Sequence, residues 1–284
     1  MLQLLQFEGR EKVEKIVQRL ECKDADYLVL QAYLQDSVAH TDTVKKNIIV
    51  QAMNYRKYIS LLQESEYILV NLAAADAKFY RNNIFILDMK SVVGKQVTPT
   101  PTIASYISAI ITFPFWSVPQ SIARKEMLPK AQKDSNYLRT NNLEIVDAQC
   151  NNVIITDSLL QSYTERNFPY YFRQSSGSDN AMGVLKFELE NPFSIFLHAT
   201  NSQNVFELEN RFLSHGCIRL EKPLGIAKAL LGDKIDINSL QNGKKDTKSE
   251  LLILPKRLQT FIIYMPLQVV KGNVFFLYDV YRKF

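Results

Sequence analysis

Two histidines and a cysteine lie within a stretch of twenty residues, and these residue types can carry out nucleophilic chemistry: His198, His215 and Cys217. A thiol attacks a carbonyl only as the thiolate, and the ordinary pKa of cysteine leaves it mostly protonated at neutral pH. A catalytic cysteine therefore needs a neighbouring imidazole or another positive group. We expect Cys217 to be the nucleophile and His198 its base, if adjacent segments of the chain bring them together.

Gly216 separates His215 from Cys217 and is one of only nine glycines in the chain. A glycine here lets the backbone turn tightly, so that successive amides around Cys217 could point at an oxyanion. The same residues could instead bind zinc, but a fourth ligand and a closely spaced cysteine pair are missing. The sequence therefore predicts a cysteine nucleophile, with no metal and no cofactor.

The remaining cysteines and the third histidine have no such neighbours. Cys22 and Cys150 are predicted to be small buried apolar residues, which is the commoner environment of a free cysteine. His40 stands alone in a helical pattern and is predicted to be a surface or core residue.

Alternating apolar and polar residues predict the strands that would position the reactive residues. One of them ends at His198. A short helix is also expected, with proline in its first turn and Gly232 as its stop. The expected strands are Tyr67–Leu72, Ala77–Ile86 with a turn inside it, Leu185–Glu190, Phe193–His198, Phe261–Val270 and Val274–Tyr281, and the helix is Pro223–Leu231.

Two segments differ from this β-rich pattern. From Glu11 to about Tyr58 the apolar residues recur with helical spacing. Residues 121–165 are more polar and resemble an insertion. We therefore expect a helical segment over residues 1–63 and a catalytic domain over residues 64–284 that carries the insertion.

The composition excludes several classes of protein. Hydrophobic residues make up 46% of the 284 residues and charged residues 22%, which indicates a globular chain. The longest uncharged run, Gln96–Ala123, contains four prolines, so no transmembrane segment is expected. The net charge of +5 is spread thinly, and we expect no nucleic-acid partner.

The segment Ser214–Arg219, with Ile195–His198 upstream, resembles the active-site signature of the L,D-transpeptidases, the YkuD-type cysteine enzymes of bacterial cell-wall synthesis. The resemblance extends from about Tyr67 to Tyr281. Phe115–Pro129 and Arg173–Gly183 resemble the long-chain members. The resemblance implies an α+β fold with a mostly β, sandwich-like or barrel-like YkuD-type catalytic domain, an inserted capping subdomain and an N-terminal helical segment from a scaffold domain.

The resemblance also implies an activity. Cys217 attacks the third-residue carbonyl of a peptidoglycan tetrapeptide stem, D-alanine leaves, and the acyl group passes to the side-chain amine of a second stem. His198 is implied as the general base and His215 as a member of the active-site loop. Ser214 and Gly216 belong to the same loop, whose amides near Gly216 and Cys217 form the oxyanion hole.

Four further residues are expected near the substrate. Arg219 matches the basic position of the signature and either holds a donor carboxylate or fixes the loop through a salt bridge. Trp116 either lines the donor groove or belongs to the core. Phe196 stands where some relatives have tyrosine. Thr200 and a backbone carbonyl are equal candidates for orienting His198.

Two other functions stay open from the sequence. Water could resolve the same thioester, which makes the protein an L,D-carboxypeptidase or endopeptidase, and a non-catalytic peptidoglycan-binding scaffold is an alternative of another class. The implied partners are peptidoglycan stem peptides and, as covalent inhibitors, carbapenem-type β-lactams. The substrate implies a periplasmic or cell-envelope location, with the signal or anchor absent from the chain as given.

Overall fold

The computed structural model describes residues 22–36, 42–82, 84–243 and 247–284. These residues divide into two compact units. The first combines the N-terminal helices with Asn71–Ala74 and Ile263–Phe284, and the second contains Ser65–Val70 and Ala75–Ile262. The C-terminal segment therefore groups with the helices and not with the sheet. The division at residue 63 that the sequence suggested stays a prediction.

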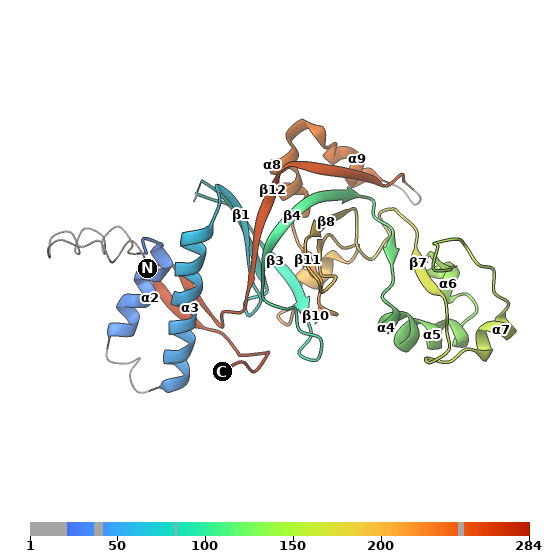
Figure 1. Cartoon of the computed structure of the whole chain (residues 1–284), viewed down its shortest axis with the longest axis horizontal. Helices are drawn as coiled ribbons and strands as arrows, with labels where there is room; N and C mark the ends of the chain where they lie inside the picture. Colours follow the sequence, from blue (N-terminus) through green and yellow to red (C-terminus); the bar gives the residue numbers. More distant parts are fainter. Residues whose placement is uncertain (1–21, 37–41, 83, 244–246) are drawn as a thin grey trace, which may run out of the picture. The chain divides into compact units, whose positions relative to one another are not determined.

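The first unit contains two helices (Figure 1): α2 (Ala25–Gln35) and α3 (Thr43–Leu62). An aspartate caps the start of each. Asp24 accepts a hydrogen bond from the Tyr27 amide at 2.8 Å, and Asp42 accepts one from the Lys45 amide at 3.0 Å. The predicted helical pattern before residue 22 and His40 lie outside the described residues. No helix in the described ranges is long and apolar enough to cross a membrane.

A C-terminal hairpin packs with these helices within the same unit. Its strands are β13 (Leu267–Val270) and β14 (Asn273–Phe276). Lys271 and Gly272 between them both have positive φ, as a two-residue type I′ turn requires. The single strand expected over Phe261–Val270 is wrong, because the chain breaks at Pro266 before β13 begins.

Nine strands of the described residues form one sheet in the second unit. Because β2 also pairs with β3, the sheet closes on itself. The expected α+β fold with a mostly β, barrel-like domain is therefore confirmed. In spatial order the strands are β10 (Phe212–Ser214), β3 (Ile84–Gly94), β11 (Ile218–Leu220), β9 (Leu197–His198), β8 (Leu185–Leu189), β4 (Ile103–Thr112), β12 (Glu250–Ile263), β1 (Glu66–Asn71) and β2 (Asp76–Arg81).

Strand β8 follows its sequence pattern. Its three apolar residues are buried and the two charged residues between them are partly exposed, as predicted from the alternation. The strand expected over Phe193–His198 is only Leu197–His198. Asn191 explains the difference, since its side-chain oxygen accepts from the amides of Phe193 and Ile195 at 3.0 and 3.1 Å. This side chain closes a turn and removes those amides from the sheet.

The predicted short helix is present as α8 (Pro223–Leu231) and ends at Gly232, whose φ is 58°. Positive φ is accessible to glycine without steric cost, which explains the stop. The other helical turns near the sheet are η4 (Gln203–Glu207), η5 (Gly232–Lys234) and α9 (Ile237–Asn242).

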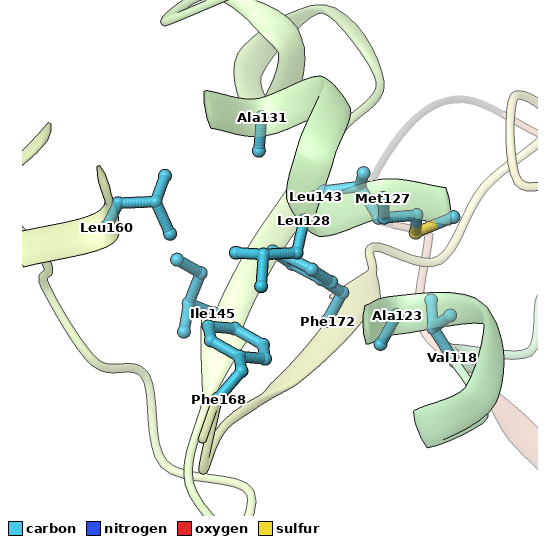
Figure 2. Packing of buried hydrophobic residues seen from close by; sticks show 10 residues of the cluster. All are labelled: Val118, Ala123, Met127, Leu128, Ala131, Leu143, Ile145, Leu160, Phe168 and Phe172. Carbon is cyan, nitrogen blue, oxygen red and sulfur yellow. The ribbon is translucent and has the colours of Figure 1, made fainter. Parts of the chain in front are cut away.

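The inserted segment forms a small cap with its own hydrophobic core (Figure 2). Phe168 and Phe172 stack with ring centroids 5.2 Å apart, and Leu128 and Ile145 pack with them. The cap contains β5 (Trp116–Ser117), α4 (Gln120–Ile122), η3 (Ala123–Met127), α5 (Leu128–Lys133), α6 (Tyr137–Thr140), β6 (Leu143–Val146), α7 (Asp157–Ser162) and β7 (Tyr171–Gln174). These elements extend beyond the 121–165 range expected from the sequence.

Phe168→Ala tests the importance of this core. Phe168 is fully buried, so truncating its ring leaves a cavity and should lower the free energy of unfolding of the cap by about 3–5 kcal/mol. Ile154→Ala is the matched control, because Ile154 is 99% exposed and its loss should cost less than about 0.5 kcal/mol. Trp116, the sole tryptophan, packs against this core, so its fluorescence during urea unfolding reports on the cap. Equal costs for the two variants would contradict the account.

Candidate active site

A parallel pairing of two short strands joins the segments that carry the predicted nucleophile and base. Leu197 in β9 pairs with Ile218 in β11, and His198 pairs with Arg219. The Ile218 amide donates to the Phe196 carbonyl at 3.1 Å. Cys217 directly precedes this pair. Because side chains alternate along a strand, Cys217 and Arg219 share a face of the sheet with His198.

The next strand adds a lysine to the same row. Lys186 in β8 pairs with His198, so a cation flanks the histidine on each side, Lys186 in one strand and Arg219 in the other. The Lys186 ammonium lies 4.5 Å from the centre of the Phe196 ring and forms an ion pair with Glu188. The Phe196 ring contacts His198 edge-on, with centroids 5.6 Å apart. Sequence analysis missed Lys186, because its alternating pattern marked it as an ordinary solvent-facing residue.

The Cys217 thiol is half-buried and uncharged at rest. Burial raises the pKa of Cys217, whereas a hydrogen bond from the Phe196 backbone and the charges of Lys186 and Arg219 act in the opposite direction. The thiol also donates a weak hydrogen bond to the Ser194 carbonyl, with sulfur and oxygen 3.9 Å apart. The site therefore contains a thiol whose ionisation two nearby cations favour.

His198 is the more enclosed imidazole. Burial and the positive charge of Arg219 lower the pKa of His198 to about 3, so the ring is neutral at physiological pH. Its Nδ1 is buried and makes no hydrogen bond of normal geometry with the described residues. The Thr200 hydroxyl instead accepts from the Ser202 amide at 3.2 Å. No hydrogen bond joins Thr200 to His198, whereas hydrogen bonds between the ring and the backbone of Ala199 and Met182 raise the pKa of His198, against the larger effect of burial.

His215 has a different environment, although it lies only two residues from Cys217. Its side chain is exposed and its Nε2 is 2.7 Å from a carboxylate oxygen of Glu126, a residue of the cap. Sequence analysis did not associate Glu126 with the site, since it belongs to a segment expected to be a polar insertion. No local motif marks it, because the contact joins residues 89 positions apart.

The loop that carries Cys217 is closed by its own serine. The Ser214 hydroxyl donates to the Cys217 carbonyl at 2.6 Å and accepts from the Gly216 amide at 3.1 Å. Gly216 has a φ of 123°, where an L side chain is strained, and a Cβ there would come within 2.9 Å of the Ile195 side chain. Both predicted loop residues, Ser214 and Gly216, thus shape a tight turn before Cys217.

A second loop braces this turn. The Thr100 hydroxyl donates to the Gly216 carbonyl at 2.7 Å and accepts from the Gly94 amide at 2.9 Å, while the Thr98 hydroxyl donates to the Ser214 carbonyl at 3.3 Å. A Cβ at Gly94 would lie 2.2 Å from the Thr98 carbonyl oxygen, so the close approach requires glycine. Sequence analysis missed these threonines; the repeated Thr-Pro string after Gly94 was the available signal.

Arg219 has no carboxylate partner in the part of the chain that the structure describes. Its guanidinium is half-buried, its Nε is buried without a hydrogen-bond partner, and it makes no salt bridge there. Burial lowers the pKa of Arg219 without neutralising it. The sequence left two roles for Arg219, binding a donor carboxylate or fixing the loop through a salt bridge. The salt bridge is not observed among the described residues.

The other predicted residues lie elsewhere. Trp116 packs against the core of the cap, which agrees with its expected alternative as a core residue. Cys22 is buried as predicted, whereas the prediction for Cys150 is wrong: its side chain is exposed in a turn where its φ is 63°. No group of three or more potential metal ligands occurs among the residues that the structure describes.

Comparison with known proteins assigns the family. The YkuD family of L,D-transpeptidase catalytic domains matches residues 65–237, which include the whole row of site residues. The chain therefore belongs to the YkuD L,D-transpeptidase catalytic-domain family.

Individual relatives are similar over part of their length. A Haemophilus influenzae protein named as a candidate L,D-transpeptidase is 31% identical over 245 residues, which cover 84% of this chain and 49% of the relative. The chain thus spans about half the length of that curated relative.

Solved structures show weaker similarity. An L,D-transpeptidase from Mycobacterium smegmatis is 10% identical, with a TM-score of 0.34 over 69% of this chain and 58% of that one. The catalytic domain of an E. faecium L,D-transpeptidase, solved acylated by ertapenem, is 13% identical, with a TM-score of 0.33 over 67% of this chain and 98% of that one.

The protonation state of His198 gives a testable prediction. The unfolded chain binds a proton at this histidine near the ordinary value of 6.5, whereas the folded chain does so only near 3. As the pH falls through that window the unfolded state holds more protons, so the protein loses stability. His198→Gln removes this titrating group. The slope of the unfolding free energy against pH should therefore decrease by the equivalent of up to one proton. NMR should show the wild-type His198 ring still neutral at about pH 4; a ring that titrates near its ordinary value would contradict this environment.

Proposed function

We propose that the protein is a peptidoglycan L,D-transpeptidase in which Cys217 is the acyl-accepting nucleophile. The observation that carries the proposal is the pairing of β9 with β11, which places His198, Arg219 and the preceding Cys217 on one face of the sheet. The substrate class comes from the family, whose catalytic domain covers these residues. The donor is a tetrapeptide stem and the acceptor is the side-chain amine of another stem.

The first step forms the thioester. Neutral His198 accepts the thiol proton through an unprotonated ring nitrogen, and the Cys217 sulfur attacks the carbonyl carbon of the third residue. Burial raises the pKa of Cys217, and the charges of Lys186 and Arg219 oppose that rise, which favours the developing thiolate. The bond from the carbonyl carbon to the D-alanine nitrogen then breaks, and the imidazolium returns the proton to that leaving amine.

The oxyanion formed in this step needs a hydrogen-bond donor. The Gly216 amide, which the sequence suggested, already donates to the Ser214 hydroxyl. The Cys217 amide has no hydrogen-bond partner among the described residues. We therefore assign the oxyanion to the Cys217 amide, while Ser214 and Gly216 shape the turn that presents it.

The second step transfers the acyl group. The amine of the acceptor stem attacks the thioester carbonyl, His198 accepts a proton from the amine, and the thiolate leaves to regenerate Cys217. The half-buried thiol and the cap limit water, which would otherwise hydrolyse the same intermediate. A carbapenem offers a strained amide to the same thiol and is proposed as a covalent inhibitor. The substrate places the protein in the periplasm or cell envelope.

Cys217→Ala tests the nucleophile. Incubation with a disaccharide-tetrapeptide should release D-alanine and yield a cross-linked dimer from the wild-type protein, and neither from Cys217→Ala, because the thioester cannot form. Cys150→Ala removes an exposed thiol of the cap and should leave both products unchanged. Mass spectrometry of the products distinguishes the outcomes. A trimmed monomer without dimer would show that the activity is hydrolysis and not acyl transfer. D-alanine release by Cys217→Ala would refute the proposed nucleophile.

Arg219→Gln tests the carboxylate contact. Arg219 lacks an acidic partner in the described chain, so we propose that it binds a donor carboxylate, an interaction worth about 1.5–3 kcal/mol. The variant should raise KM for the tetrapeptide about ten- to a hundredfold. To identify the contact, the donor carboxylates are amidated one at a time and KM is measured with the wild type and with Arg219→Gln. The donor that lacks the contacted carboxylate should show the same KM with both proteins. A similar loss with every donor would contradict a carboxylate contact.

A further inference from the structure

The cap reaches the nucleophile loop through one side-chain contact. Glu126 in η3 lies 2.7 Å from Nε2 of His215, while Cys217 follows two residues later in the loop closed by Ser214. Both residues belong to the same compact unit. The side chains of Glu126 and His215 are 45% and 36% exposed, so substituting Glu126 leaves no cavity in the cap.

Glu126 lies in a local irregularity of its helix. The η3 segment is a π-helical turn in which the Leu128 amide donates to the Ala123 carbonyl five residues earlier. Pro129 follows it and cannot donate to the carbonyl of Lys125, which disfavours an ordinary α-helical turn there. Ala123 and Met127 point into the core of the cap. Glu126 is not among the buried residues of that core, and its side chain is 45% exposed.

The neighbouring lysine does not compete with His215 for the Glu126 carboxylate. Its neighbour Lys125 forms an ion pair with Glu165 instead, at 3.8 Å. Tyr137 lies close enough for Glu126 to affect it: burial raises the pKa of Tyr137, and the negative charge of Glu126 raises it further. Among the described residues, His215 is the side chain that shares a hydrogen bond with Glu126.

The two histidines thus differ in what orients them. The His198 ring has hydrogen bonds with the backbone of Ala199 and Met182, whereas His215 has a carboxylate as its partner. A carboxylate only accepts hydrogen bonds, so a neutral His215 held by Glu126 carries its proton on Nε2 and leaves Nδ1 unprotonated. In nucleophilic sites a third group commonly orients the histidine that moves protons.

We propose that Glu126 is a positioning residue of the reaction, supplied by the cap, which fixes the ring orientation and tautomer of His215 beside Cys217. This inference rests on the proposed function. Docking of the cap then completes the nucleophile loop, and His215 with its free Nδ1 takes part in proton transfer to or from the acceptor amine or the leaving group. The cap thereby contributes to the chemistry.

Three variants test the proposal. Glu126→Ala removes the acceptor, Glu126→Gln keeps an acceptor oxygen without the charge, and Glu165→Gln alters another exposed glutamate of the cap that does not contact His215. We expect Glu126→Ala to lower kcat for D-alanine release by up to about 100-fold with little change in KM, as misplacement of a proton-transfer group does. Glu126→Gln should recover part of the loss, and Glu165→Gln should match the wild type.

A spectroscopic measurement separates this proposal from the proposed function. In the wild-type protein, ¹⁵N NMR of the His215 ring should show the tautomer protonated on Nε2, and Glu126→Ala should show a mixture of tautomers. This result does not depend on which substrate the protein uses. The positioning role would be overturned if Glu126→Ala left both the ring signals and kcat unchanged. If Glu126→Ala altered the ring signals but the wild-type protein released no D-alanine, only the proposed function would be refuted.

Discussion

The site depends on a single constraint, the parallel pairing of β9 with β11. Two short strands from different parts of the sequence lie side by side, and their register places His198 opposite Arg219, two residues after Cys217. A parallel pair cannot be made by a tight hairpin, so the connecting chain must leave and return. The turn closed by Ser214 and the bracing contact from Thr100 hold the returning chain in place.

Burial at this pairing decides the resting charges. The enclosed His198 ring and the half-buried Cys217 thiol are both uncharged, because low-dielectric surroundings disfavour their charged forms. The permanent charges are cations, Lys186 and Arg219, on strands to either side. A site arranged in this way favours negative charge when it forms, either on sulfur or on a bound carboxylate, and needs no preformed thiolate–imidazolium pair.

The sequence predicted those parts of the structure that depend on residues close to one another in the chain. The segment around Cys217, the alternation in β8 and the proline and glycine that bound α8 are all local signals, and the structure contains them. Lys186, Thr100 and Glu126 were missed, because each reaches the site only through pairing or packing between distant segments. The side chain of Asn191, which shortened the strand before His198, acts differently, since it closes a local turn whose hydrogen bonds interrupt the apolar pattern of the following residues.

The central claim is that Cys217 becomes covalently acylated by the donor stem. The most direct measurement is peptide-level mass spectrometry of the protein quenched in acid during turnover with a disaccharide-tetrapeptide. The account predicts an adduct on the peptide containing Cys217, with the mass of the donor minus D-alanine, that disappears when an acceptor amine is added. An adduct on Cys22 or Cys150, or D-alanine release with no adduct on any cysteine, would contradict it.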